Sequence, residues 1–262
     1  MFKKMKKTSN GVRHQINVKK YLLSKNSNLS KSLVVGKKVH SGRSSLFGNI
    51  TVRHKGGGKK KLFRNLNTIK DIKLGLLLCV NYDPTRNSFT SLYYDFFYNK
   101  FHSCLFTKST YPGSILSSFQ CLPELYLGSY LQIKNVPTGS IIHSLHSFST
   151  SKYIKSAGTF GVLIEKNLEN CKIRLPSGSV KQFSVETFCV LGSIYNNFSD
   201  IVVKGKAGRS RHMGKRPSIR GVAMNPVDHP HGGRTKGGRP SVTPWGIPTK
   251  GKPTRKKKYG KI

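Results

Sequence analysis

Apolar side chains are concentrated in the middle of the chain, where they fall into short runs of strand length. Such runs cover residues 48–54 (GNITVRH), 73–83 (KLGLLLCVNYD) and 89–98 (FTSLYYDFFY), and they are rich in the residues that favour strands. The sequence DPTRN (83–87) separates the last two runs with a turn signal, because proline follows aspartate. The pattern therefore predicts a β-hairpin in this part of the chain.

A second group of strand-like segments follows residue 126. It consists of GSYLQIKNV (128–136), GSIIHSLHSF (139–148), GVLIEKN (161–167), CKIRLPSGSVKQFSV (171–185) and TFCVLGSI (187–194). In CKIRL, apolar residues alternate with Lys172 and Arg174 as in a half-buried strand, and PSGS (176–179) predicts a turn. The spacing predicts two small barrels that meet near residues 122–128, so the predicted fold class is mainly β.

Charge is distributed unevenly along the chain. Residues 1–70 contain 19 Lys and Arg and no acid, and residues 201–262 contain 17 against the single acid Asp228. Between them, residues 71–200 carry 11 Lys and Arg against 8 acids, a net charge of +3. Two cationic arms favour a polyanionic partner, and RNA fits because Lys and Arg release counterions condensed on its phosphates. An anionic membrane surface is the weaker alternative, since Gly and Pro in the arms prevent a long amphipathic helix.

These patterns divide the chain into four parts. We expect a basic N-terminal extension at 1–47, an RNA-binding barrel at 48–125, a second barrel at 126–200 and a basic Gly/Pro-rich extension at 201–262. The last part is poor in large apolar residues, so it is expected to be extended and to become ordered only on its partner.

Cysteine usage argues against a zinc ribbon or a disulfide framework, and hydropathy argues against a membrane-spanning protein. The five cysteines, Cys79, Cys104, Cys121, Cys171 and Cys189, are widely spaced and form no CxxC pair. They are expected to be small buried residues in a reducing compartment. No apolar run approaches the roughly 18 residues of a membrane span.

The first candidate binding segment is GNITVRHKGGGKKKLFR (48–64). A strand is expected to end at Arg53-His54-Lys55, and the chain then turns through three glycines into a lysine run. Glycines allow backbone N–H groups to approach a phosphate, which the flanking cations would neutralise. The pattern does not match the G-x-x-x-x-G-K-[ST] loop of nucleotide hydrolases. A flexible hairpin tip with solvated lysines is the alternative.

The second candidate is NPVDHPHGGRTKGGRP (225–240), which has the ingredients of a metal site, an active site or an RNA-binding segment. A metal held by His229 and His231 would need further ligands, for which only Asp228 and His212 are available. Hydrolysis would need a rigidly held nucleophile and base, and a stretch of prolines and glycines is expected to have no scaffold of its own. RNA threading is therefore the favoured interpretation.

Several motifs closely resemble the family of bacterial-type large-subunit ribosomal protein two: TVRHKGGGKK, SAGTFGVLIEK (156–166) and GVAMNPVDHPHGGRTKGGRPSVTPWGIPTKGKPTR (221–255). The resemblance is collinear from KKTSNGVRH (6–14) onward, and it is loosest over residues 66–125. It implies an OB-like barrel followed by an SH3-like barrel, both packed on large-subunit rRNA. It also implies extensions toward the peptidyl transferase centre, which the family helps to assemble, and a contribution to subunit association without catalysis.

The residues expected to bind rRNA follow from the cationic arms and from the family motifs. They are Arg43, Arg53, His54, Lys55, Gly56, Gly57, Gly58, Lys59, Lys60, Arg209, Arg211, Arg216, Arg220, Asn225, Asp228, His229, His231, Arg234, Lys236, Arg239, Trp245 and Lys250. Bacterial relatives tend to have Gly-Glu-Gly where this chain has Arg234-Thr235-Lys236, so an acid is lost and charge is gained. The protein alone is expected to hold no metal or cofactor, and any Mg²⁺ would belong to the rRNA.

His229 has two candidate roles. As a general base it would take part in peptide-bond formation, and as a positioning group its imidazole would donate to a phosphate or a base edge. Asp228 would orient the ring or accept from a base amine or a backbone N–H. Positioning is favoured.

Two other functions compete with a ribosomal role. An enzyme acting on RNA would need a paired acid and base, but the acids are scattered singly. A free basic RNA-binding or RNA-chaperone protein is the second alternative. The expected ribosomal partners are large-subunit rRNA, neighbouring proteins and the small subunit at the intersubunit face. The abundance of Phe, Tyr, Asn, Lys, Leu and Ser favours an organelle-encoded protein of a mitochondrial ribosome, with a plastid or bacterial cytoplasm as alternatives.

Overall fold

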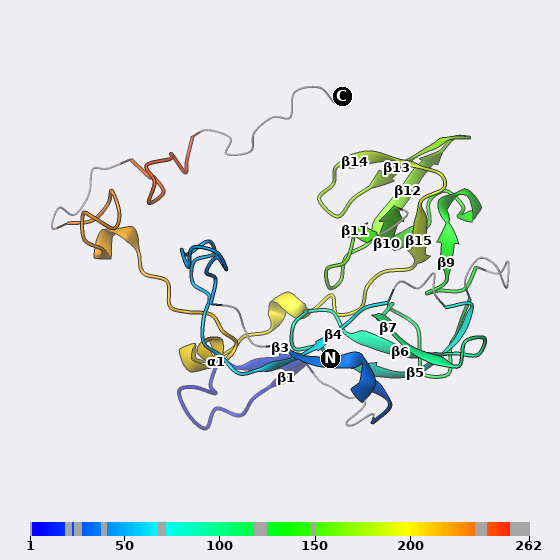
Figure 1. Ribbon diagram of the computed structural model, residues 1–262, viewed down its shortest axis with the longest axis horizontal. Helices are drawn as coiled ribbons and strands as arrows, with labels where there is room; N and C mark the ends of the chain where they lie inside the picture. The colour runs from blue at the N-terminus through cyan, green and yellow to red at the C-terminus, as the bar shows by residue number, and fades with distance from the viewer. Residues whose placement is uncertain are drawn as a thin grey trace. The chain divides into compact units, whose positions relative to one another are not determined.

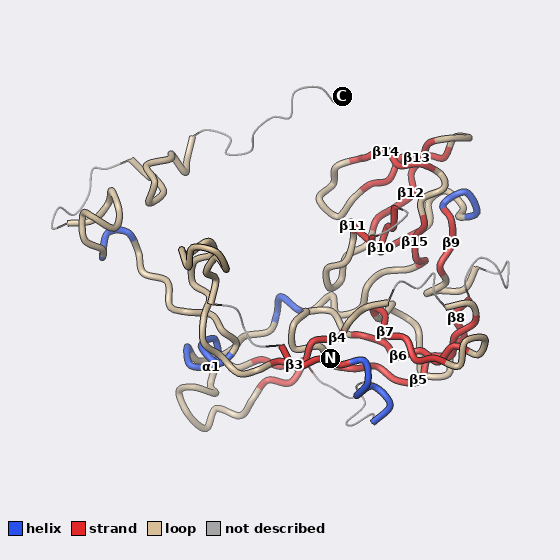
Figure 2. The backbone as a smooth tube through the Cα atoms, in the orientation of Figure 1, coloured by secondary structure: helices blue, strands red, loops and turns tan. Residues whose placement is uncertain are grey.

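The structure is a computed structural model that describes residues 2–18, 23, 28–37, 41–67, 72–117, 125–147, 150–233 and 240–251. It divides into two compact units. We call Met1–Val39 with Gly58–Met213 the barrel unit, and His40–Gly57 with Gly214–Ile262 the arm unit. Strands dominate the barrel unit, and loops dominate the arm unit (Figures 1 and 2). The prediction of a mainly β chain with basic arms is confirmed.

The described elements are short. The strands are β1 (Phe2–Lys4), β2 (Ile16–Val18), β3 (Val34–Lys37), β4 (Lys61–Arg64), β5 (Leu74–Asn81), β6 (Thr90–Asp95), β7 (Lys100–Leu105), β8 (Ile115–Ser117), β9 (Tyr130–Gln132), β10 (Ile141–Ser147), β11 (Thr150–Tyr153), β12 (Gly161–Lys166), β13 (Asn170–Arg174), β14 (Val180–Ser184) and β15 (Phe188–Leu191). The helical turns are η1 (Asn28–Leu33), η3 (Ile133–Asn135), η4 (Ser199–Ile201), α1 (Ala207–His212) and η5 (Gly221–Ala223).

The first sheet has the antiparallel order β7-β6-β5-β8. Its β5–β6 hairpin turns at the predicted DPTRN sequence, so this prediction is confirmed. The carboxylate of Asp83 is buried there and accepts hydrogen bonds from the Thr85 backbone N–H at 2.8 Å and from Arg86 Nη1 at 2.6 Å. These bonds hold the turn closed and satisfy the buried charge.

The second sheet has the order β14-β13-β12-β10-β15-β9, with β11 paired to β10. In β13, Cys171 and Ile173 are buried while Lys172 and Arg174 are exposed, which confirms the predicted half-buried strand. The PSGS turn is also confirmed, because it joins β13 to β14 and closes with a bond from the Leu175 N–H to the Ser179 carbonyl at 2.9 Å. The two sheets are consistent with an OB-like barrel followed by an SH3-like barrel.

A buried seam joins the two sheets within the barrel unit. Tyr130 on β9 and Val190 on β15 pack into the apolar core of the first sheet together with Phe106. Beside them, the Thr107 hydroxyl lies 3.0 Å from Nε2 of His143 on β10. A separate core, which includes Leu131, Ile142 and Leu163, fills the second sheet.

Two predictions about the arms are wrong. Residues 48–54 do not form a strand; only Ile50 pairs, with Arg43, because the N–H groups of Thr51 and Val52 both bond to the Gly42 carbonyl and close a compact loop. The C-terminal extension is not simply extended. Residues 201–213 pack in the barrel unit, where Val203 pairs with Ile16, and the described residues beyond them fold into hydrogen-bonded turns.

The described cysteines Cys79, Cys104, Cys171 and Cys189 are free, and all except the partly exposed Cys79 are buried. Burial raises the pKa of the Cys171 and Cys189 thiols, which keeps them protonated. Cys121 lies outside the described residues. In the described part of the chain, no helix has the length and apolar composition of a membrane span.

Acid should destabilise the seam, because His143 is buried as a neutral ring. Desolvation, and then the proximity of His146, lowers the pKa of His143 from 6.5 to about 3. Below pH 6.5 the unfolded chain therefore binds more protons than the folded chain, so the contribution of His143 to stability is lost as the pH falls. From about pH 6.5 to about pH 5 we expect the free energy of unfolding to fall by about 2 kcal/mol.

Urea unfolding at several pH values measures this effect. The His143→Gln variant should lose most of the pH dependence in this range, whereas His14→Gln, at an exposed position, should keep it. A His143→Gln variant with the full dependence would contradict the assignment.

Candidate nucleic-acid interface

The arm unit begins with a tight loop around Gly42. Gly42 is buried with a φ of +74°, and its carbonyl accepts the N–H groups of Thr51 and Val52 at 2.9 and 3.0 Å. Arg43 Nη1 donates to the Gly48 carbonyl at 2.9 Å, which links the two ends of residues 43–48 within the loop. Arg43 therefore shapes this loop with one of its donors and keeps the remaining ones for a partner.

Two segments that are about 160 residues apart pair side by side in the arm unit. The Arg216 N–H bonds to the His54 carbonyl at 3.0 Å, and the Gly56 N–H bonds to the Gly214 carbonyl at 3.1 Å. Lys55 and Lys215 form an antiparallel bridge between these bonds. Backbone pairing therefore concentrates cations from both arms in one place, and nothing in the sequence pattern predicted Lys215.

His54 is held tightly within this pairing. Its φ of +58° is rare for a residue with a Cβ, and Nδ1 lies 3.2 Å from the Pro217 carbonyl, to which it donates. Because Nδ1 carries the proton in this bond, Nε2 is an acceptor when the ring is neutral, and the residue is exposed. The histidine therefore joins the two segments by its side chain as well as by its backbone.

The three glycines after His54 differ from one another. Gly56, Gly57 and Gly58 have φ values of +147°, +64° and +91°, which residues with a Cβ rarely adopt. The Gly56 N–H is consumed by Gly214, but in the described residues no backbone acceptor lies against the N–H groups of Gly57 and Gly58. The predicted approach to phosphate is therefore open to Gly57 and Gly58, not to Gly56.

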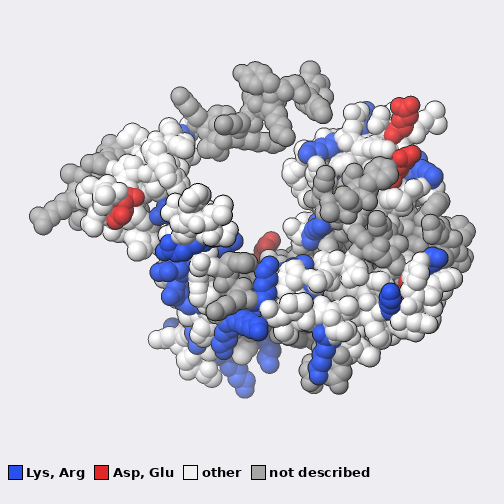
Figure 3. All heavy atoms as spheres, viewed as in Figure 1, with Lys and Arg blue, Asp and Glu red and all other residues white. Residues whose placement is uncertain are grey.

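The barrel unit contributes cations of its own. Lys59 and Lys60 are exposed, and the Lys59 N–H bonds to the His212 carbonyl at 3.1 Å. Lys61 Nζ donates to the Met213 carbonyl at 3.0 Å, so this lysine supports the last turn of α1. Figure 3 shows Lys and Arg side chains gathered around the segment that Figure 1 labels α1.

The two predicted arginines of α1 have different environments. Arg209 is half-buried and its Nη1 donates to Asn17 Oδ1 at 3.0 Å, which attaches α1 to β2. Arg211 is exposed. Both lie in the last turn, where the negative end of the helix dipole favours cations. Arg211 is the better placed of the two for an external anion.

The segment 224–233 has a scaffold of its own, which corrects the expectation from its prolines and glycines. The Asn225 carbonyl accepts the N–H groups of Asp228 and His229 at 3.0 and 3.3 Å, and the Gly232 N–H returns to the His229 carbonyl at 2.8 Å. The Gly233 N–H bonds to the Met224 carbonyl at 3.1 Å. The prolines restrict the backbone to shapes compatible with these turns, and the glycines permit the close contacts.

The His229 ring is buried and its protonation is set by its neighbours. Nδ1 accepts the backbone N–H of His231 at 3.0 Å, so the neutral ring carries its proton on Nε2. Desolvation, followed by the charges of His231 and Arg53, lowers the pKa of His229. The ring also packs against Gly221, where an added Cβ would lie 2.7 Å from Nδ1.

Asp228 does not orient this ring. Its side chain is exposed, and no described group forms an ion pair or hydrogen bond with its carboxylate. The backbone of His231 performs that orientation instead.

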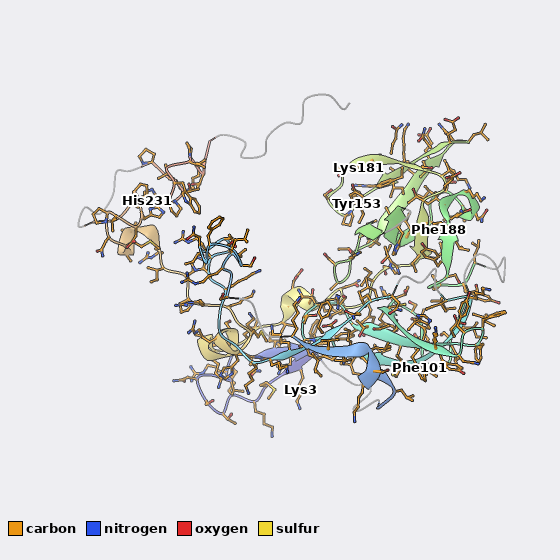
Figure 4. All side chains as sticks on the ribbon, viewed as in Figure 1. Lys3, Phe101, Tyr153, Lys181, Phe188 and His231 are labelled. Atoms are coloured by element: carbon orange, nitrogen blue, oxygen red, sulfur yellow. The ribbon has the colours of Figure 1, made fainter. Side chains whose placement is uncertain are left out.

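His231, labelled in Figure 4, connects this loop to the next. Its Nε2 lies 2.8 Å from the Pro240 carbonyl, and its ring lies 4.7 Å from that of His229. Beyond Pro240, residues 241–249 form a small hairpin in which the Thr243 N–H bonds to the Ile247 carbonyl at 2.8 Å. Trp245 stands at its tip and is 73% exposed.

The remaining predicted residues are exposed or lie outside the described part. Arg53, Lys55, Arg216, Arg220, Asn225 and Lys250 are exposed, while Arg234, Lys236 and Arg239 lie outside the described residues. Among the described residues, no group of three or more His, Cys, Asp or Glu could hold a metal ion. The arrangement fits recognition of an extended anion through many separate contacts.

Two family models match the chain. "Ribosomal Proteins L2, RNA binding N-terminal domain" matches residues 30–118, and "Ribosomal Proteins L2, C-terminal domain" matches residues 126–246. The chain belongs to the ribosomal protein L2 family. Within this L2 chain, the predicted residues from Arg43 to Lys60 fall in the first match, and those from Arg209 to Trp245 fall in the second. Lys250 falls outside both.

A curated relative extends the similarity to the whole L2 chain. "Large ribosomal subunit protein uL2m" of Reclinomonas americana is 39% identical over 272 residues, an alignment that covers 100% of this chain and 96% of that protein. The family identified from the motifs is therefore confirmed over both barrels and both arms.

Proposed function

We propose that this chain is a structural constituent of the large ribosomal subunit, where it binds rRNA and helps to assemble the peptidyl transferase region. The observation that carries the proposal is the pairing of His54–Gly56 with Gly214–Pro217, which unites two cationic arms into one surface. Such a surface gains affinity by releasing counterions from phosphates. Its many separate contacts fix the position of a protein on folded RNA.

The proposed division of labour follows the four predicted parts. The predicted barrels at 48–125 and 126–200 place the protein. Because residues 48–57 belong to the arm unit and residues 201–213 to the barrel unit, the arm unit is the part that reaches along the rRNA. The proposed rRNA-binding residues are those predicted from the sequence, apart from Gly56, whose N–H is bonded to the Gly214 carbonyl. The proposed partners are large-subunit rRNA, neighbouring large-subunit proteins and the small subunit at the intersubunit face.

The proposed location is the mitochondrial ribosome, since the curated relative carries the name uL2m and is similar along its whole length. Any Mg²⁺ at the interface would belong to the rRNA.

Cross-linking tests this proposal at the level of individual peptides. Peptides from 41–57 and from 214–233 belong to one unit, so after ultraviolet irradiation of intact organelles they should carry nucleotides from the same region of large-subunit rRNA. Cross-links spread over many cellular RNAs would support the alternative of a free RNA-binding or chaperone protein.

A positioning role, not catalysis, is proposed for His229. A general base needs a free lone pair directed at its substrate, but Nδ1 is occupied by the His231 N–H and Nε2 bears the proton. Nε2–H is instead a donor suited to a phosphate oxygen or a base acceptor.

The His229→Ala variant separates these roles in reconstituted particles. We expect a lower yield of assembled and joined subunits, with peptidyl transfer per assembled particle within about threefold of normal. Loss of a general base costs roughly 10²–10⁴-fold in rate, so a hundredfold loss per assembled particle would refute positioning. His14→Ala, at an exposed position, serves as the control.

A further inference from the structure

In its described residues, the arm unit has no apolar core. None of the residues in the two buried apolar clusters comes from its described part. Its large apolar side chains face outward instead: Leu46 is 84% exposed, Phe47 80%, Val227 91% and Trp245 73%. Hydrogen bonds without an apolar core hold such a unit weakly, so these side chains need a partner to cover them.

The charge of the arm unit restricts that partner to a polyanion. Its two segments hold 16 Lys and Arg against Asp228 alone, a net charge of +15. A protein partner would have to be strongly acidic and apolar at once. RNA provides both features where its bases are unpaired, because phosphates lie beside exposed aromatic faces.

Two aromatic side chains are presented in the same way. Phe47 lies in a loop closed by bonds from the Gly48 N–H to the Ser44 carbonyl at 3.2 Å and from the Ser44 N–H to the Asn49 carbonyl at 2.8 Å. Trp245 lies in a loop closed by a bond from the Gly246 N–H to the Thr243 carbonyl at 3.0 Å. In each loop a glycine with positive φ, +66° at Gly48 and +76° at Gly246, follows the aromatic residue directly.

This construction places a flat ring on a short turn whose backbone is closed by hydrogen bonds. Next to Phe47, Arg43 Nη1 is bonded to the Gly48 carbonyl, so the cation and the ring share one loop. Next to Trp245, the Ser241 and Thr249 hydroxyls lie 2.7 Å apart and close the base of the hairpin. A restrained backbone at each ring reduces the entropy that ordering costs on binding, which favours stacking on a base over a diffuse apolar contact.

We infer that Phe47 and Trp245 are stacking platforms for unpaired RNA bases, so that the arm unit recognises single-stranded or looped rRNA and not only the backbone of duplexes. The inference rests on the proposed function and specifies the kind of RNA that the arm unit binds. Cations supply affinity for any phosphate chain, and the two rings select for accessible bases.

Trp245 is the only tryptophan in the chain, so its fluorescence reports on one tip. The full chain is titrated with four probes: single-stranded RNA, a perfect RNA duplex of equal charge, inorganic polyphosphate and anionic phospholipid vesicles. Single-stranded RNA should quench Trp245 emission by about half or more, because a stacked base quenches indole, while duplex and polyphosphate bind with little quenching. Quenching that is equal for single strand and duplex would overturn the inference, as would a blue shift with vesicles alone.

Paired variants test the ring chemistry. Phe47→Leu and Trp245→Leu keep an apolar side chain but remove the aromatic face, and each should weaken single-strand binding about tenfold while leaving duplex binding unchanged. Phe47→Tyr and Trp245→Phe keep an aromatic face, so these variants should retain single-strand binding. Both positions are exposed, so folding should be unaffected, which circular dichroism checks. Unchanged binding by both Leu variants overturns the inference but leaves rRNA binding intact; failure of the wild type to bind any RNA overturns the proposed function itself.

Discussion

A chain that ends at Met213 should bind large-subunit rRNA about a thousandfold more weakly than the full chain at low salt. The truncation removes 13 Lys and Arg together with one acid. For each phosphate that is no longer neutralised, the slope of log affinity against log salt concentration becomes shallower by close to one unit. The full chain should lose about 10³–10⁵-fold in affinity between about 50 and 200 mM salt, and the truncated chain much less. Filter binding over a salt series measures both quantities.

The truncated chain should still fold. Neither apolar cluster contains a described residue from 214–262, so the circular dichroism of the strands should be retained. A chain that ends at Gly251 is the matched control, because it removes six of the 13 cations and keeps the described loops of the arm unit. If the chain ending at Met213 were unfolded, the division between a self-supporting barrel unit and an RNA-binding arm unit would be wrong.

Replacing Gly232 by alanine should open the loop that holds His229. An added Cβ would lie against the carbonyl group of Asn225 and 2.8 Å from the Met224 carbonyl oxygen, so backbone would have to move. Asn225 accepts the N–H groups that close the turn, and its displacement should cost about 2 kcal/mol or more of local stability. Hydrogen exchange of the Asp228, His229 and Gly232 amides should accelerate by about thirtyfold or more.

Gly208→Ala is the control for this substitution. It makes the same chemical change on α1, at a position where no atom lies within 4 Å of the added Cβ, and alanine favours the helix. The Gly232 variant should incorporate poorly into large subunits, whereas the Gly208 variant should incorporate normally. Normal amide protection in the Gly232 variant would mean that the loop does not depend on this close contact.

The barrels could be predicted from the sequence because their signals are local. Alternation in CKIRL placed Cys171 and Ile173 inside, and the Asp-Pro pair at 83 marked a turn that buried hydrogen bonds then close. The cationic arms were equally visible, since charge is read directly from composition. These features depend on neighbouring residues, so no long-range contact was needed to recognise them.

The architecture of the arms could not be predicted because it depends on pairing between distant segments. His54 contacts Pro217 across 163 positions, and no periodicity in either segment indicates this. The apolar residues of GNITVRH predicted a strand. The N–H groups of Thr51 and Val52 instead bond to the carbonyl of Gly42, which has a positive φ, and the segment forms a loop. Likewise, the orientation of His229 depends on a backbone N–H two residues away, which is a matter of geometry and not of composition.

Sedimentation tests the central claim most directly. Organelle lysate from cells that express a tagged form of the chain is separated on a sucrose gradient after a high-salt wash, which removes proteins held only by nonspecific charge. A structural constituent of the large subunit should remain with large-subunit rRNA at close to one copy per particle. Recovery of the chain at the top of the gradient, with large subunits intact below it, would contradict the account.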